Sequence, residues 1–443
     1  MDKKEILAIL EEWNCWSKPF VKSFKREDYE NEVLNKSTTN EIIFIKGVRR
    51  SGKSTILRNH IDNLVEQGVD KNRILFVNLE DPRFASYLSL DLLEEIKEAY
   101  LYYLSPSEKP YIFLDEVQNI DQFEKWLLKE YELKQSHLFA TGSNSKLLSS
   151  EIGSSLSGRY LSIYVSPLSF KEFVQFKGVD KITPYSLVSQ KRVYEKYFEE
   201  FMSYGGFPKV VLTEDTSLKE AELKSYFDSI LLRDIVARYK LDNFRSLEQL
   251  SILLLSSISN PMSITKVSKK LGVSFDLANR YFEYLENTYM IQTLPLFDWS
   301  LQKQFTNPRK IYSIDTGLSK RVSFEVGRRV GDLLENIVFL ELKREFDELY
   351  YFKTKQDYEV DFLVKQREKI THLVQVSRTL KDEKTKKREL RALVKALMEL
   401  KYTKETKLWL ITMDESSVEL IDDIEIEVIN VIEWLLLSKI EDK

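Results

Sequence analysis

The residues with the clearest chemical potential lie at positions 47–54, which read GVRRSGKS and fit the phosphate-binding pattern G-x-x-x-x-G-K-[ST]. In that pattern the two glycines, Gly47 and Gly52, let the backbone turn tightly enough to aim its N–H groups at phosphate oxygens. Lys53 can then reach the β- and γ-phosphates of a nucleoside triphosphate, and the Ser54 hydroxyl can bind Mg²⁺. The pattern therefore predicts a nucleotide-binding loop.

The segments on either side of this loop have the order that such a site requires. Residues 41–46 (EIIFIK) are mostly β-branched or aromatic and predict a strand, and residues 54–66 carry apolar side chains at helical spacing. Strand, loop and helix in this order place the backbone N–H groups of the loop at the positive end of a helix. We therefore expect Arg50, Ser51 and Thr55 to contact the nucleotide along with the lysine and the glycines.

A second run, residues 111–116 (YIFLDE), consists of four apolar residues followed by two acids. It predicts a buried parallel strand with charges at its carboxyl end, which is the edge where α/β sheets bind ligands. Asp115 would then hold the Mg²⁺, and Glu116 would be the general base that activates the attacking water. A solvated acidic turn is the alternative, but the phosphate loop upstream favours the catalytic interpretation.

A polar stretch, residues 141–144 (TGSN), ends a further apolar run. A small polar side chain there would lie between Asp115 and the γ-phosphate, where Ser143 or Asn144 could orient the attacking water and respond to hydrolysis. An ordinary Asn/Ser turn explains the same residues equally well, so both interpretations stay open.

The elements that must position these residues alternate from residue 41 to about 175. Apolar runs predict strands at 41–46, 73–78, 111–114, 137–142 and 161–165, and helices at 54–66, 88–104 and 123–131. Such alternation is typical of a parallel sheet with helices on both faces. Residues 1–40 precede it as a helical, aromatic segment. Most of its rings should pack on the sheet domain, although one or two could flank an adenine base.

The middle of the chain, residues 176–260, reads as a helical region broken at 205–208 (GGFP), and 228–240 predict an amphipathic helix. Residues 261–300 then have the outline of a helix-turn-helix with a following wing. This segment carries local positive charge from Lys266, Lys269, Lys270 and Arg280. It could contact duplex DNA, or it could be only a packing module.

Residues 301–443 predict another α/β domain, with helices at 332–346 and 383–401 and strands at 349–353, 359–364, 372–377, 407–412 and 425–430. This order resembles the core of restriction-endonuclease-like nucleases. The metal site of those nucleases takes a glutamate from the helix, an aspartate from one strand and an E-x-K from the next.

Glu335 and Asp361 fit the first two positions of that metal site. The third position reads Gln375-Val376-Ser377, so a carboxylate has become an amide and the lysine has become a hydroxyl. Mg²⁺ binding would be weakened, and the group that activates water would be missing. We therefore expect an inactive, structural or DNA-holding domain rather than a nuclease.

Composition limits the number of domains, the cellular compartment and the kinds of partner that we expect. The 443 residues suffice for two or three domains, and the net charge of −4 argues against a global attraction to nucleic acid. A single cysteine, Cys15, rules out an internal disulfide and favours a reducing cytoplasm. No apolar run approaches the length of a membrane helix, and the N-terminus lacks the apolar core of a signal peptide. We expect a cytoplasmic protein with no membrane partner.

The chain resembles the prokaryotic AAA family of ATPases in a series of motifs: GVRRSGKST, YIFLDEVQNI, TGSNS, SGRY, RDIVARY, and EVDFLV with LVQVS. More closely, it resembles two-part ATPases that join an N-terminal AAA domain to a nuclease-like C-terminal domain of unknown function. The resemblance covers nearly the whole chain. It implies an AAA-type P-loop NTPase sheet at 41–175, a helical lid at 176–260, a winged-helix-like segment at 261–300 and a nuclease-like domain at 301–443.

The resemblance also implies roles for particular residues. Lys53, Ser54, Asp115 and Glu116 take the nucleotide and Mg²⁺ roles, with Ser143 or Asn144 as sensor. Arg159, just ahead of the last predicted strand, is similar to the finger that AAA proteins present to a neighbouring subunit's nucleotide, where it stabilises charge on the transferring phosphoryl group. A finger of this kind implies a homo-oligomer.

We conclude from the sequence that the chain binds ATP and Mg²⁺ and is an ATPase whose nucleotide state is coupled to a C-terminal half that binds DNA or protein. ATP is expected rather than GTP because no N/T-K-x-D guanine-reading signature is apparent. Two alternatives stay open: a nucleotide-gated DNA-binding switch with little turnover, and an ATP-gated, metal-dependent nuclease.

Overall fold

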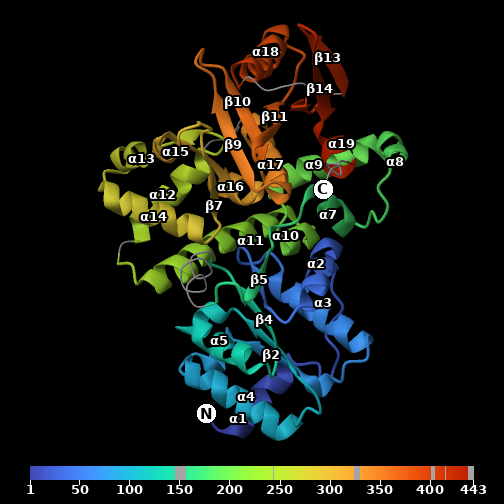
Figure 1. Cartoon of the computed structure of the whole chain (residues 1–443), viewed down its shortest axis with the longest axis vertical. Coiled ribbons are helices and arrows are strands. Elements are labelled where there is room, and N and C mark those ends of the chain that lie inside the picture. The colour runs from blue at the N-terminus through green and yellow to red at the C-terminus, as the bar shows by residue number, and fades with distance from the viewer. Residues whose placement is uncertain (145–155, 243, 324–329, 401–404, 415, 438–443) are drawn as a thin grey trace. The chain divides into compact units, whose positions relative to one another are not determined.

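The computed structural model describes residues 1–443 except 145–155, 243, 324–329, 401–404, 415 and 438–443 (Figure 1). The chain divides into two compact units. The N-terminal unit comprises Met1–Ser166 with Asn287–Tyr289, and the C-terminal unit comprises Pro167–Glu286 with Met290–Lys443. Among the described residues, none of the helices combines the length and the apolar character needed to cross a membrane.

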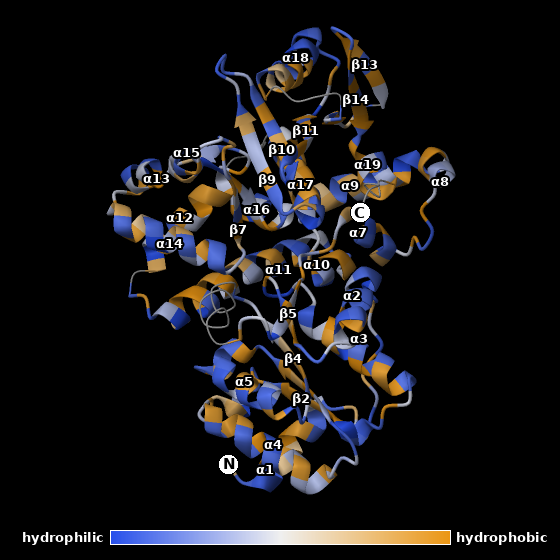
Figure 2. Ribbon diagram, in the orientation of Figure 1, coloured by the Kyte–Doolittle hydropathy of each residue, from blue (hydrophilic) through white to orange (hydrophobic). Residues whose placement is uncertain are grey.

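The N-terminal unit is built on a parallel sheet with the order β2-β3-β4-β1-β5, which confirms the predicted parallel sheet. Its strands are β1 (Ile42–Lys46), β2 (Ile74–Asn78), β3 (Tyr111–Asp115), β4 (His137–Gly142) and β5 (Tyr160–Tyr164). The central strands are buried along nearly their whole length and are mostly apolar, because helices cover both faces. Figure 2 shows this as hydrophobic colour gathered on the strands.

Helices α1 (Lys3–Trp13), α4 (Leu90–Leu104) and α5 (Phe123–Leu133) cover one face of this sheet, where Phe44 is buried. Helices α2 (Glu27–Ser37) and α3 (Lys53–Glu66) cover the other, where Ile45 is buried. Successive residues of β1 therefore enter opposite cores, as the two-residue period of a strand requires. Short 3₁₀ helices, η1 (Lys71–Arg73), η2 (Pro82–Phe84) and η3 (Val117–Asn119), shape the connections.

The N-terminal aromatic segment is fastened to the edge strand β2. The Trp13 indole N–H donates to Asp81 Oδ2 at 2.7 Å, and the Trp16 indole N–H donates to the Ile74 carbonyl at 2.7 Å. The Asn14 side-chain amide bonds both backbone polar groups of Phe76. These two tryptophans therefore pack on the sheet domain and hydrogen-bond to residues at or near β2. The sequence led us to expect such packing for most rings of the segment. A ring beside adenine stays a prediction.

The C-terminal unit begins with helices α7 (Phe170–Phe176), α8 (Pro184–Ser189), α9 (Lys191–Tyr204), α10 (Pro208–Leu212), α11 (Thr216–Ser229) and α12 (Phe244–Ser256). The predicted break lies at Gly205, whose φ is 74° and whose Cβ, if present, would meet Asp315 Oδ1 at 1.9 Å. The stretch 228–240 was expected to be one amphipathic α-helix. Instead α11 ends at Ser229, and a π-helix, η5 (Ile230–Ala237), follows it.

A small three-stranded antiparallel sheet with the order β6-β8-β7 comes next. Along the chain its elements are β6 (Pro261–Met262), α13 (Ile264–Leu271), α14 (Phe275–Asn287), β7 (Ile291–Leu294), α15 (Leu301–Thr306) and β8 (Arg309–Ser313). β8 lies beyond residue 300, in the range that the sequence assigned to the last domain. It pairs instead with both strands of the preceding segment.

The last part of the chain forms a mixed six-stranded sheet with the order β13-β14-β12-β11-β10-β9. The elements are α16 (Thr316–Val322), α17 (Val330–Glu345), β9 (Glu348–Lys353), β10 (Glu359–Gln366), β11 (Lys369–Ser377), α18 (Glu383–Leu400), β12 (Lys407–Thr412), β13 (Ser417–Ile421), β14 (Ile424–Asn430) and α19 (Val431–Leu437). Helices α17 and α19 cover one face, and α18 covers the other.

Candidate nucleotide site

The phosphate loop follows the carboxyl end of β1 and is held in a conformation that needs its glycines. Gly47 has a φ of 152°, and a Cβ there would lie 2.0 Å from the Val165 carbonyl oxygen. Its N–H donates to the Gly142 carbonyl at 3.3 Å, so the loop begins tightly between the ends of β4 and β5. Gly52, with a φ of 100°, turns the chain into α3. Only glycine fits the first position.

The lysine and the serine of the loop point toward the acidic end of β3. Lys53 is almost fully buried, and its Nζ lies 3.3 Å from Glu116 Oε1 and 3.3 Å from the Val48 carbonyl oxygen. The Ser54 hydroxyl donates to Asp115 Oδ1 at 2.9 Å. The two motifs found separately in the sequence therefore meet at one point.

The end of β3 is fixed by its neighbour β4. The Thr141 hydroxyl donates to Asp115 Oδ1 at 2.6 Å, and the backbone N–H of Glu116 donates to Thr141 Oγ1 at 2.8 Å. Gln118 donates its side-chain amide to Glu116 Oε2 and, at 3.1 Å, to Ser143 Oγ. Glu116 has a φ of 59°, a left-handed conformation that is costly outside glycine. Gln118 and Lys53 hold its carboxylate in place.

Burial separates the two acids electrostatically. Desolvation and the neighbouring Glu116 raise the pKa of Asp115 to about 6. Burial opposes ionisation of Glu116 as well, but Lys53, Arg49 and Gln118 outweigh it and lower the pKa of Glu116. Glu116 is thus an anion at neutral pH, as a general base must be, and Asp115 carries an unfavourable charge that a nearby cation would stabilise.

The donor set fits Mg²⁺. Ser54 offers a hydroxyl and Asp115 a carboxylate within hydrogen-bonding distance of each other, and Mg²⁺ prefers oxygen ligands supplied by one or two protein groups together with phosphates and water. A bound cation would be ligated by the Ser54 hydroxyl oxygen and by the Asp115 carboxylate. The residues present are therefore those that Mg²⁺ would need.

The other predicted site residues lie at different distances from this centre. Ser143 and Asn144 are buried just beyond the end of β4, and the stretch that carries them continues into residue 145, outside the described residues. Ser51 is fully buried, and its hydroxyl has no hydrogen-bond partner among the described residues. Arg50 is exposed, with a φ of 69°, and Thr55 is half-buried in the first turn of α3.

Arg159 lies apart from this group. It directly precedes β5, at the amino end of the sheet, where Tyr160 pairs with Ile42. The phosphate loop starts beyond the carboxyl end of β1, so the length of a five-residue strand, about 16 Å, separates the two. Arg159 Nε donates to Glu132 Oε1 at 3.1 Å. It is not brought to the nucleotide site of its own chain.

Four residues that the sequence analysis did not single out take part in the site. Arg26, buried beside the Tyr29 ring, donates to the backbone carbonyls of Ser51 at 3.0 Å and Ser166 at 2.9 Å and so supports the loop. The others are Arg49, Gln118 and Thr141. Arg49 and Thr141 lie within recognised motifs, so their position in the sequence could have identified them as site residues. Arg26 sits in an ordinary charged stretch and gives none.

The C-terminal carboxylates surround a lysine that the sequence analysis did not consider. Lys310 Nζ, carried by β8, lies 2.9 Å from Asp361 Oδ1, 2.9 Å from Glu359 Oε1 and 3.1 Å from Glu335 Oε1. Burial and the neighbouring Asp361 raise the pKa of Glu335 to about 8. The ammonium thus occupies the space between Glu335 and Asp361, the two carboxylates that fit the metal positions of the nuclease core. Among the described residues, no group of three potential metal ligands is suitably placed.

Comparison with known proteins assigns the chain in three consecutive segments. Residues 39–174 match the family described as an AAA domain, residues 195–325 match a domain of unknown function (DUF8612), and residues 330–434 match another domain of unknown function (DUF4143). The AAA match ends close to the boundary at residue 175 that the sequence indicates.

Two solved structures match the chain at low similarity. A Walker-type ATPase of Pyrococcus abyssi is 14% identical, with 68% of this chain and 96% of that chain covered and a TM-score of 0.45. The Orc1 protein of Aeropyrum pernix, in complex with DNA, is 13% identical, with 69% and 94% covered and a TM-score of 0.32.

Two sequence relatives are much closer. An uncharacterized protein of Methanocaldococcus jannaschii is 35% identical over 427 residues, which cover 93% of this chain and 92% of the relative. An uncharacterized protein of Haemophilus influenzae is 32% identical over 353 residues, which cover 79% of this chain and 85% of the relative. The chain therefore belongs to the family of these two proteins, and its N-terminal part is a P-loop ATPase domain of the AAA class.

Proposed function

We propose that this protein binds ATP with Mg²⁺ and hydrolyses it, and that the nucleotide state is passed to the C-terminal half. One observation carries the proposal: the Ser54 hydroxyl is bonded to Asp115 while Lys53 is paired with Glu116. The lysine proposed to bind phosphate, the pair proposed to bind the metal and the proposed base thus lie together in one buried cluster. This cluster is at the carboxyl edge of a parallel sheet. That edge is where α/β sheets bind ligands.

The geometry suggests a division of labour among these side chains. Loop N–H groups and Lys53 bind the β- and γ-phosphates, and Ser54 and Asp115 hold the metal, which when bound neutralises charge on the phosphate oxygens. Glu116 accepts a proton from the attacking water, because its carboxylate is ionised at neutral pH and is already oriented by Gln118. Ser143 and Asn144 lie one strand over, where they can orient that water.

Binding of a fluorescent ATP analogue with and without Mg²⁺ tests the first half of this proposal. Lys53→Ala should weaken binding at least tenfold, because a charge-assisted phosphate contact is worth about 1.5–3 kcal/mol. Ser54→Ala should remove most of the gain in affinity that Mg²⁺ gives to the wild type. Lys129→Ala, an exposed lysine on α5, is the matched control and should leave binding unchanged. Equal affinity in wild type and Lys53→Ala would refute the site.

A second proposal, that the segment around residues 261–313 binds duplex DNA, rests on its topology. Three helices, α12, α13 and α14, accompany an antiparallel sheet of order β6-β8-β7, which is the arrangement of a winged helix with α14 as the second helix of a helix-turn-helix. Lys266, Lys269, Lys270 and Arg280 are exposed on α13 and α14. Positive charge on exposed helices is what contact with the phosphate backbone requires.

Fluorescence anisotropy of a labelled duplex, measured across salt concentrations, tests this second proposal. The triple charge reversal of Lys266, Lys269 and Lys270 to Glu should weaken binding and flatten the dependence of log K on log salt, by up to about 0.9 for each lost phosphate contact. The triple reversal of Lys4, Lys125 and Lys129 to Glu, three exposed lysines of the N-terminal unit, controls for the same change in net charge. Absence of binding at low salt, or an unchanged salt slope in the triple variant, would rule out this surface.

A further inference from the structure

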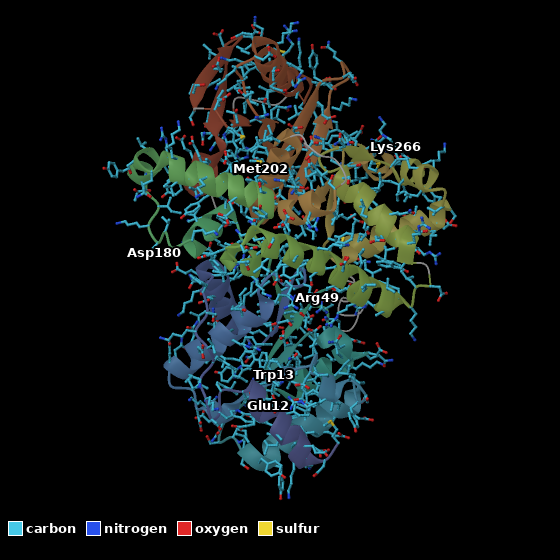
Figure 3. The ribbon with its side chains drawn as sticks, turned by 180° about the vertical axis from the view of Figure 1, so that it is seen from behind. Glu12, Trp13, Arg49, Asp180, Met202 and Lys266 are labelled. Atoms are coloured by element: carbon cyan, nitrogen blue, oxygen red, sulfur yellow. The ribbon has the colours of Figure 1, made fainter. Side chains whose placement is uncertain are left out.

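Arg49, the third residue of the phosphate loop, forms an ion pair that runs across the candidate site. One guanidinium nitrogen lies 2.7 Å from Glu80 Oε1. The Arg49 side chain is only 9% exposed, whereas that of Glu80 is 33% exposed. Figure 3 labels Arg49 in the view from behind. An arginine in a buried loop position, paired with a more accessible glutamate, suggests that the pair can open.

The strand order determines what this ion pair crosses. Arg49 follows β1, and Glu80 lies two residues beyond β2, while β4 and β3 lie between those strands. The spacing of neighbouring strands, about 4.8 Å, puts β1 and β2 about 14 Å apart. The backbone N–H of Leu79 donates to the Asp115 carbonyl, so Glu80 is anchored beside the end of β3. Arg49 and Glu80 together therefore extend over the carboxyl ends of β4 and β3, beside Asp115 and Glu116.

The charges at this edge indicate what Arg49 would bind. Lys53 and Arg49 are the cations, and Glu80, Asp115 and Glu116 are the carboxylates. Arg49 and Lys53 both lower the pKa of Glu116, so the guanidinium lies within electrostatic reach of the general base. A triphosphate entering this acidic edge needs every cation available, and a planar guanidinium can bind two phosphate oxygens at once.

We propose that Arg49 is a γ-phosphate ligand supplied by the same chain, held by Glu80 when no nucleotide is bound and transferred to the phosphate when ATP arrives. The inference rests on the proposed ATP site and extends it. The exchange is balanced, because one carboxylate partner of the guanidinium is replaced by a phosphate oxygen while Glu80 turns to solvent. Arg49 would thus distinguish ATP from ADP, since only ATP carries the group that it binds.

Binding of ADP and of a non-hydrolysable ATP analogue to the full-length protein tests this assignment. Arg49→Gln should leave the affinity for ADP within about twofold of wild type and weaken that for the ATP analogue about 10- to 100-fold. Arg49→Lys should recover part of the loss. Glu80→Gln should bind the ATP analogue as tightly as wild type or more tightly, because the guanidinium is released. Turnover in Arg49→Gln should fall about 100-fold or more.

Arg73→Gln is the matched control, because it breaks an arginine–glutamate pair, with Glu108, at the other end of β2. It should change neither affinity. If Arg49→Gln weakens ADP and the ATP analogue equally, or weakens neither, the assignment is wrong. If wild type binds neither nucleotide, the proposed ATP site itself fails. Retained ADP binding in Arg49→Gln also establishes that this variant is folded.

Discussion

At the residue scale, His60 is a polar side chain in an apolar environment. It is buried on α3, with its ring 5.1 Å from that of Phe139 and 6.2 Å from that of Phe113. Neither ring nitrogen has a hydrogen-bond partner among the described residues. Burial lowers the pKa of His60 to about 4. The folded protein thus keeps this imidazole neutral at a pH where the unfolded chain would protonate it.

This mismatch makes stability depend on pH in a definite direction. Between about pH 6.5, the ordinary histidine pKa, and pH 4, only the unfolded state takes up the proton. The contribution of the neutral His60 to the free energy of unfolding is therefore full above pH 6.5 and is lost on acidification. Chemical denaturation at pH 7 and at pH 5 measures how much free energy of unfolding is lost on acidification. That loss should be about 2 kcal/mol smaller in His60→Leu than in wild type. Phe139→Leu, which does not titrate, should retain the wild-type loss. An identical pH dependence in His60→Leu would contradict this account.

Site residues could be predicted from the sequence where a motif ties residue type to position. Lys53, Ser54, Asp115 and Glu116 were identified in this way, and the structure brings them together. Arg26 and Lys310 could not be, because each acts through contacts with residues far away in the sequence, such as Ser166 and Asp361. The sequence reveals that such residues are charged but not which partner they meet.

At the element scale, the junction of β1 with the phosphate loop depends on Gly47. Gly47→Ala would place a Cβ 2.0 Å from the Val165 carbonyl at a φ of 152°, so both the loop and the start of the segment after β5 would have to move. We expect a loss of several kcal/mol in stability and loss of nucleotide binding.

Gly68→Ala is the control for this variant. Gly68 also has a positive φ, 94°, but no atom lies within 4 Å of its would-be Cβ. The cost there should be only about 1–2 kcal/mol, with nucleotide binding intact. Denaturant melts and nucleotide titrations of the two variants separate two costs. Gly47→Ala reports the steric clash together with the backbone strain, and Gly68→Ala reports the backbone strain alone. Equal losses would mean that the close approach to Val165 does not matter.

The lysine that β8 inserts among the carboxylates of α17 and β10 gives a second prediction at this scale. Lys310→Ala should lose about 3–5 kcal/mol, because Glu335, Glu359 and Asp361 are left facing one another. With the ammonium gone the carboxylates can move toward a cation, and carboxylate oxygens suit Mn²⁺, so millimolar Mn²⁺ should raise the Tm of this variant but not that of wild type. Lys365→Ala, which breaks the more exposed pair with Glu348, should cost less than about 1 kcal/mol.

A rise in the wild-type Tm with Mn²⁺ as large as that of the variant would contradict this interpretation. The carboxylates would then bind a metal with Lys310 in place, and the nuclease alternative would gain support.

Elements were predictable where burial imposes a simple pattern. The strands of the parallel sheet are continuous apolar runs because both faces are covered, and their predicted bounds differ from the observed ones by at most one residue. β13 was missed because an exposed edge strand keeps no such run, and β8 because it begins Arg309-Lys310. The π-helix Ile230–Ala237 was read as an α-helix, since apolar spacing does not register one inserted residue.

At the scale of the whole molecule, the position of Arg159 bears on assembly. It lies at the opposite end of the sheet from the phosphate loop, and its side chain is 40% exposed. If Arg159 stabilises charge during hydrolysis, it can do so only in another subunit's site. We therefore expect turnover per subunit to rise with protein concentration and to drop at least 100-fold in Arg159→Ala.

Mixing two inactive variants tests this arrangement without knowledge of the subunit number. Arg159→Ala retains Glu116, and Glu116→Gln retains Arg159, so a mixed assembly contains some complete sites. Turnover should return in the mixture although each variant alone is inactive. A mixture as inactive as its components would contradict a finger supplied by a neighbouring subunit.

Phosphate release from wild type and Glu116→Gln, measured with and without Mg²⁺, tests whether the cluster at the carboxyl end of β3 hydrolyses ATP. Wild type should release phosphate, and the release should stop when Mg²⁺ is chelated. The rate in Glu116→Gln should be at least 100-fold lower, with ATP binding retained. Nucleotide binding without release in wild type, or equal release by both proteins, would contradict hydrolysis at this cluster.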